Sequence, residues 1–219
     1  MSGNRKVLIW DFATRLFHWL LVGLVAAAYA TWRLNWMEWH AWIGEAVLAL
    51  ILFRLLWGFF GSDSARFAWF LASPRKAARY LSTMLRREPD RQVGHNPAGG
   101  WMVLLFIGLL LGETLTGLYV LNDVADEGPF TEITPAPIAN AITALHAVLW
   151  DALLAAVALH LAAILLYAVV KRQNLVWPLI TGRKTLPDVV SAPRIAGGLG
   201  ALLLLVLSAI AAAALARYL

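Results

Sequence analysis

The sequence predicts an all-α membrane protein, and its composition gives the first reason. Of the 219 residues, 61% are hydrophobic and only 14% are charged, and the mean hydropathy is +0.69. An average soluble domain is roughly half apolar and a quarter charged. A chain this short cannot hide such an excess of apolar side chains in one core, so many of them must face lipid. A disordered chain, a collagen-like rod and a soluble enzyme are thereby excluded.

The second reason is a set of five apolar stretches, each long enough for the roughly 20 helical residues that cross a bilayer. They cover residues 16–34, 40–60, 100–121, 142–170 and 195–216. The segment 61–99 is too polar to span, and its aromatic and basic residues favour helices lying on the membrane surface. We expect a four-helix bundle within residues 1–185 and a fifth, C-terminal transmembrane helix within 186–219. Near that last helix, Gly197, Gly198 and Gly200 would permit close packing against the bundle or a partner.

The basic residues predict the orientation of these helices. Fifteen of the 18 lie in segments 1–15, 61–99 and 171–194, which alternate with segments that hold none. The positive-inside rule then puts the N-terminus in the cytoplasm and the C-terminus outside. The net charge of +5 therefore indicates topology and contact with anionic membrane lipid, and no nucleic-acid partner is expected.

The segment 122–141 has the opposite charge and lies on the outer side in this topology. It contains Asp123, Asp126, Glu127 and Glu132 and no basic residue. It is either a solvated loop or a docking surface that attracts a basic partner.

Cofactor chemistry is limited by the absence of cysteine. Disulfides, thiolate zinc sites, iron–sulfur clusters and covalently attached c-type haem are excluded. Any cofactor must be held by histidine, methionine, carboxylates or backbone.

Histidines are the strongest functional signal, because ionisable residues inside membrane helices are costly. Four of the five, His18, His40, His146 and His160, fall in or beside predicted spans. His146 and His160 are 14 residues apart, which puts them on one helix face within about 40° and separates them by about 21 Å. In the predicted topology His40 is level with His146 near the outer side, and His18 is level with His160 near the inner side.

Two histidine pairs at two depths are what two six-coordinate haems require, since neutral imidazoles bind the iron from both faces. The fold class is then a membrane four-helix haem-binding bundle with a fifth helix. Hydrogen bonds between helices and a proton relay are the alternatives, whereas zinc or copper would need more ligands at one depth. Glu113, in the middle of the third span, is the acidic residue most costly to bury, and the sequence identifies no partner for it.

Several motifs resemble the bacterial cytochrome b561 / nickel–iron hydrogenase cytochrome b family, over about residues 5–185. They are VLIWDFATRLFHW from Val7, HAWIG from His40, FRLLWG from Phe53, GHNPAGG from Gly94, and the His146/His160 spacing. The resemblance implies a b-type cytochrome with two haems in a bacterial inner membrane. It assigns His18 and His160 to the cytoplasmic-side haem and His40 and His146 to the periplasmic-side haem.

Other residues near the expected haems have two interpretations each. Arg15 and Arg54 could bind haem propionates or reach lipid headgroups. Gly44, four residues after His40 on the same face, could leave room for the macrocycle or serve helix packing. Because a quinone lies near this loop in related complexes, His95 and Asn96 are candidate contacts for a quinone headgroup or a propionate. The alternative is a turn built by the Asn-Pro and Gly-Gly pairs.

The expected function is electron transport between the quinone pool and a periplasmic redox partner such as a c-type cytochrome. Alternatives are a stand-alone superoxide or quinone oxidoreductase, and the anchor subunit of a hydrogenase-like complex. A rival from another class is a haem-free anchor or ion carrier. Whether the chain is an enzyme by itself is left open by the sequence.

Overall fold

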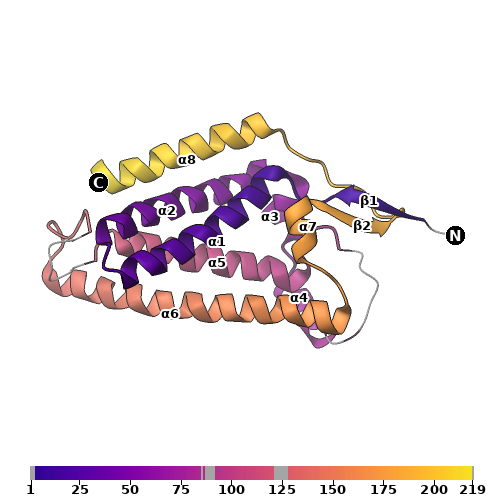
Figure 1. The fold of residues 1–219 in the computed structure, drawn as a ribbon, viewed down its shortest axis with the longest axis horizontal. Helices are drawn as coiled ribbons and strands as arrows, with labels where there is room; N and C mark the ends of the chain where they lie inside the picture. Colours follow the sequence, from indigo (N-terminus) through magenta and orange to yellow (C-terminus); the bar gives the residue numbers. More distant parts are fainter. Residues whose placement is uncertain (1–2, 85, 87–91, 121–127, 219) are drawn as a thin grey trace. The chain divides into compact units, whose positions relative to one another are not determined.

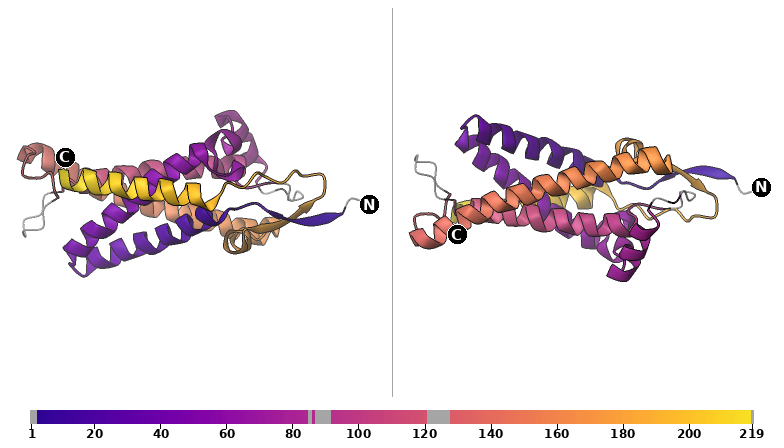
Figure 2. Two further views of the ribbon diagram at one scale, coloured as in Figure 1. Left: turned by 90° about the horizontal axis from the view of Figure 1, so that it is seen from above. Right: turned by 90° about the horizontal axis from the view of Figure 1, so that it is seen from below.

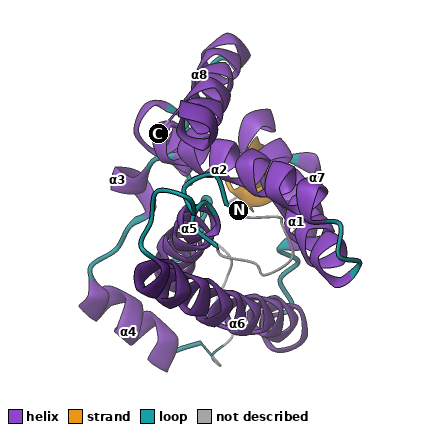
Figure 3. Cartoon of the chain, turned by 90° about the vertical axis from the view of Figure 1, so that its left-hand side faces the viewer, coloured by secondary structure: helices purple, strands orange, loops and turns teal. Residues whose placement is uncertain are grey.

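The computed structural model describes residues 3–84, 86, 92–120 and 128–218. Its regular structure is almost entirely helical (Figure 3), which confirms the predicted fold class. Within these residues, five helices are long and apolar enough to cross a membrane. They are α1 (Phe12–Arg33), α2 (Met37–Phe60), α5 (Pro97–Gly117), α6 (Ala136–Leu166) and α8 (Gly198–Tyr218), labelled in Figure 1.

Polar caps start two of these helices earlier than the apolar stretches predict. The Asp11 carboxylate accepts hydrogen bonds from the Thr14 backbone N–H (2.6 Å) and hydroxyl (3.0 Å), so α1 begins at residue 12. The Asn96 side-chain oxygen accepts from the Gly99 N–H (2.7 Å), so α5 begins at residue 97. Side chains that accept from free N–H groups stabilise helix starts, and hydropathy does not record them.

Before α5, the described residues of the segment 61–99 form short helices that do not span, as predicted. They are the 3₁₀ turn η1 (Asp63–Ala65), α3 (Phe67–Phe70) and α4 (Pro74–Ser82). In α4, Ala77 is buried while the basic residues are exposed. This polarity suits a helix at an interface.

Beyond α6 the chain continues into a π-helical turn, η2 (Tyr167–Lys171), and a short helix α7 (Val176–Thr181). Arg172 ends the π turn in the left-handed conformation, with φ of 54°. Such π turns are rare and are frequent at functional sites.

The sequence analysis missed a two-stranded sheet. Strand β1 (Asn4–Leu8) pairs antiparallel with β2 (Arg183–Pro187), joining segments near both ends of the chain (Figures 1 and 2). Val7 and Leu186 are buried with Ile9 and Trp10 in a small core. Strands of five residues among basic side chains carry too little apolar alternation to be recognised in the sequence.

The contacts within the chain define two compact units. Unit 1 comprises residues 1–16, 56–105 and 157–201, and unit 2 comprises residues 17–55, 106–156 and 202–219. Each long helix contributes part of its length to each unit. Unit 1 contains the sheet, the short helices and His95, whereas unit 2 contains His18, His40 and His146.

In unit 2 the core is apolar around α2, where Leu48 and Ile51 are each 1% exposed. Helix α8 contributes small residues, and Ala216 packs with Leu118 and Phe130. A side chain at Gly197, Gly198 or Gly200 would meet no atom of the described residues within 4 Å. Those glycines therefore make no close helix contact with the described residues, and the buried positions of α8 are Ala201, Ser208, Ala212 and Ala216.

The acidic segment is only partly visible. Asp123, Asp126 and Glu127 lie outside the described residues, whereas Glu132 is described. The last residues of the segment 122–141 belong to α6, because that helix begins at residue 136.

Candidate haem site

Unit 2 brings His40 and His146 together. His40 lies in the first turn of α2 and His146 lies on α6, 106 positions later in the sequence. The two imidazoles are close enough to interact electrostatically. Their pairing as ligands of one haem stays a prediction from the sequence.

Both rings are oriented in the same way by the backbone. His40 Nδ1 lies 2.9 Å from the carbonyl oxygen of Ala28, and His146 Nδ1 lies 3.0 Å from that of Glu113. A carbonyl oxygen can only accept, so Nδ1 must carry the hydrogen in each ring. In the neutral ring, Nε2 then keeps the lone pair that a metal needs. A metal-ligating histidine almost always donates its other N–H in this manner.

A second acceptor holds His146. The Thr116 hydroxyl lies 3.0 Å from His146 Nδ1 and donates its own hydrogen to the Gly112 carbonyl (2.7 Å). Its oxygen can therefore accept from Nδ1–H. Sequence reasoning missed Thr116, although it lies one turn after Glu113 on α5.

The structure supplies the partner of Glu113 that the sequence left open. One carboxylate oxygen lies 3.4 Å from His146 Nε2. The other is buried and has no hydrogen-bond partner among the described residues. A polar group thus faces Nε2 of His146 from the interior of unit 2.

Two glycines make room beside these histidines. A side chain at Gly44 would meet nothing within 4 Å among the described residues, so this glycine borders open space and makes no tight helix contact. At Gly117 an added Cβ would lie 3.3 Å from His146 Cε1, so the absence of a side chain lets the imidazole approach α5. Paired imidazoles and free space next to one of them fit a bis-histidine haem.

The other predicted pair is divided between the units. His18 belongs to unit 2, where its ring meets the Trp19 ring edge-on with centroids 5.1 Å apart. His160 belongs to unit 1. Their pairing therefore stays a prediction from the sequence.

The two arginines differ in burial. Arg54 is only 3% exposed, so it does not extend to lipid headgroups from this fold. A buried guanidinium requires anionic or polar compensation. Arg15 donates to the Ile180 carbonyl, and its buried Nε has no hydrogen-bond partner among the described residues. Both side chains suit the binding of a carboxylate.

In unit 1 the side chains of His95 and Asn96 make different contacts. The preceding Gly94 has φ of +84°, a conformation that favours glycine. The His95 ring contacts the rings of Trp10 and Phe70, with centroids 4.8 and 4.6 Å apart. Asn96 instead caps α5 and donates to the Tyr167 hydroxyl (2.8 Å).

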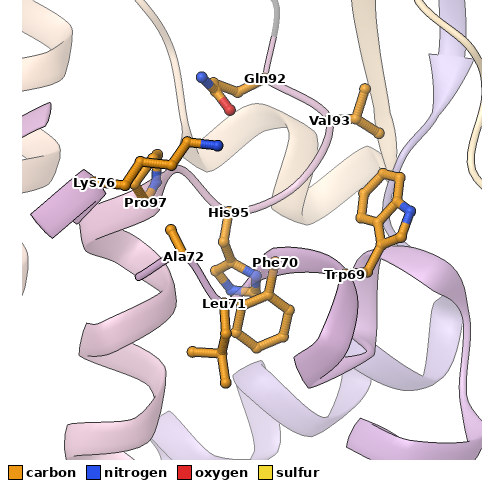
Figure 4. Close-up of a pocket in the computed structure, with 9 residues that line it drawn as sticks. All are labelled: Trp69, Phe70, Leu71, Ala72, Lys76, Gln92, Val93, His95 and Pro97. Carbon is orange, nitrogen blue, oxygen red and sulfur yellow. The ribbon is translucent and has the colours of Figure 1, made fainter. Parts of the chain in front are cut away.

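His95 also lines an open pocket of about 270 Å³, drawn in Figure 4. Its polar members are Lys76, Gln92 and His95, and its other members are Trp69, Phe70, Leu71, Ala72, Val93 and Pro97. Polar groups beside aromatic walls suit a flat ligand with polar oxygens.

The first motif also has a structural role that sequence reasoning missed. Asp11 is 3% exposed and caps α1, and its carboxylate lies 3.4 Å from the indole nitrogen of Trp57. Trp57 is itself 2% exposed. Part of the motif therefore stabilises the start of α1.

Comparison with known proteins identifies the family of the chain. The family model described as Prokaryotic cytochrome b561 matches residues 9–182, most of the chain. No curated protein and no solved structure matches the chain significantly. The chain therefore belongs to the prokaryotic cytochrome b561 family, a family of membrane proteins that transfer electrons through b-type haem.

Proposed function

We propose that this protein conducts electrons across the bacterial inner membrane, between the quinone pool and a periplasmic redox partner such as a c-type cytochrome. Two b-type haems would supply the reversible one-electron chemistry. The observation that carries the proposal is the matched anchoring of His40 and His146, whose Nδ1 atoms both lie at backbone carbonyls.

In this proposal His40 and His146 hold the outer haem, and His18 and His160 hold the inner one. Gly44 leaves space for the macrocycle beside His40. The guanidinium of Arg54 compensates propionate charge, because a buried cation is stabilised by a carboxylate through charge-assisted hydrogen bonds.

The pocket around His95 is the proposed quinone site. Lys76, Gln92 and His95 offer hydrogen-bond donors for quinone oxygens, and Phe70 offers an apolar wall for its ring. An imidazole can also accept a proton released by quinol, because its ordinary pKa is near neutrality. The basic residues concentrated in unit 1 support a cytoplasmic position for this pocket.

The first experiment counts haem. The full chain is purified in detergent, and haem per polypeptide is measured together with reduced-minus-oxidised spectra. We expect two b-type haems, and His40→Ala should retain one of them. His95→Ala, the matched control outside the ligand set, should retain both. Colourless wild-type protein, or His40→Ala with two haems, would contradict the proposal.

A second experiment tests the quinone site. His95→Ala should slow haem reduction by an added quinol analogue and leave reduction by dithionite unchanged, since the variant changes only the proposed entry of electrons. Lys6→Ala is a control for a basic residue on β1 outside the pocket. Equal quinol rates in both variants and the wild type would refute the assignment of the pocket.

A further inference from the structure

A cluster of polar side chains closes the end of α6 in unit 1. The hydroxyls of Tyr80, on α4, and Tyr167, on η2, are hydrogen-bonded to each other. Asn96 donates to the Tyr167 hydroxyl (2.8 Å), and its own oxygen is fixed by the N–H of Gly99 (2.7 Å). The cluster is therefore held from three separate segments and is oriented before any ligand binds.

Lys171 places a positive charge over this cluster. Its ammonium lies 5.5 Å from the ring centroids of both Tyr80 and Tyr167, and the residue is only 8% exposed. Among the described residues, no hydrogen bond or ion pair joins its ammonium to another group. The faces of aromatic rings compensate a cation only in part, and a buried charge is costly unless it is paired. The site is therefore suited to an anion.

The cluster lies on the side of α6 that carries His160. Tyr167 is seven residues after His160, which is about two turns or 10.5 Å along the axis. Regular helical spacing up to Leu166 keeps Tyr167 within about 20° of the direction of His160, and Lys171 follows at the end of the π turn. The anion site thus follows the proposed ligand of the inner haem on the same helix face.

We propose that Lys171, Tyr80, Tyr167 and Asn96 form a carboxylate site for a propionate of the haem held by His160. The inference rests on the proposed function, because it takes the haem for granted. A lipid phosphate shares the anionic chemistry. The burial of Lys171 favours a ligand presented from inside the protein over one that arrives from the membrane surface.

Redox potentiometry of the full chain tests the proposal with Lys171→Met. Loss of the positive charge should disfavour reduction of one haem by about tenfold, equivalent to about 59 mV for one electron, and leave the other unchanged. Tyr80→Phe, which keeps the ring and removes the hydroxyl, should shift the same haem in the same direction by less. Arg172→Gln, an adjacent and exposed loss of charge, is the matched control and should shift neither.

Two arms identify the source of the anion. After reconstitution with haem dimethyl ester, which lacks free carboxylates, Lys171→Met and wild type should have equal potentials. With native haem, the difference in potential between Lys171→Met and wild type should be the same in nanodiscs of phosphatidylcholine and in nanodiscs of phosphatidylglycerol. A difference that persists with the ester and requires phosphatidylglycerol would overturn the propionate assignment in favour of lipid.

The two levels of inference fail separately. A wild-type protein without haem would refute the proposed function. A wild-type protein with two haems, in which Lys171→Met and Tyr80→Phe both behave like Arg172→Gln, would refute the carboxylate site alone.

Discussion

The hydroxyl of Thr116 provides the sharpest test of how the outer haem ligand is held. Thr116→Val keeps the shape of the side chain and removes the oxygen that lies 3.0 Å from His146 Nδ1. The Glu113 carbonyl remains as an acceptor at 3.0 Å, so the ring keeps its orientation but loses one of two contacts. One hydrogen bond contributes about 0.5–1.5 kcal/mol, which corresponds to roughly a 2- to 12-fold loss of haem affinity.

The variant also has an expected electronic effect. An acceptor at Nδ1–H makes the opposite nitrogen a stronger donor to iron, which favours the oxidised state. Thr116→Val should therefore raise the midpoint potential of the outer haem as well as weaken its binding. A variant that only destabilises the fold is not expected to raise the midpoint potential.

The assay uses a His160→Ala background, in which only the outer haem is expected. Haem transfer to apomyoglobin gives the rate of loss, and optical titration gives the potential. Thr114→Val is the matched control, because Thr114 lies on the same helix and its hydroxyl bonds, among the described residues, only to the Leu110 and Leu111 carbonyls. If Thr116→Val and Thr114→Val agree in both measurements, the proposed anchoring of His146 is wrong.

Two further predictions concern glycines. Gly44→Leu should fill the open space beside His40 and remove one haem per polypeptide, while the helix content measured by circular dichroism stays unchanged. Gly23→Leu, which also enters open space, is the control and should retain both haems. Equal haem content in the two variants would contradict the proposal that Gly44 leaves room for the macrocycle. Gly58→Ala should lower stability in detergent by about 1–3 kcal/mol, because the new Cβ would overlap the Phe67 ring. Thermal unfolding measures this change against Gly23→Ala, and equal melting temperatures would show that Phe67 moves aside without cost.

The membrane helices and the histidines on them could be predicted because both depend on local properties of the chain. Hydropathy over about 20 residues identifies a span, and helical spacing fixes the relation of His146 to His160. The ends of the helices were less accessible, since single caps such as Asp11 decide them. The β1–β2 pair could not be predicted, because it joins residues about 180 positions apart through strands with little apolar alternation.

The partners of individual side chains were accessible only in part. The heptad step from His160 to Tyr167 is present in the sequence and could have pointed to that tyrosine. The hydrogen bond between Tyr167 and Tyr80, 87 positions away, could not be inferred, because no pattern in α4 specifies which side of this helix packs against η2. The different roles of His95 and Asn96 could not be inferred either: the two are adjacent in sequence, but His95 lines a pocket and Asn96 caps a helix.

The sequence alone determined that the chain lies in a membrane and how far His146 and His160 are separated along one helix, because burial in lipid and spacing along a helix are one-dimensional properties. Only the tertiary structure decided that Glu113 and Thr116 meet His146, that Gly44 borders open space, and that Lys171 is buried over two tyrosines. These contacts depend on the rotation of each helix about its own axis and on side-chain rotamers. Packing between distant segments sets both.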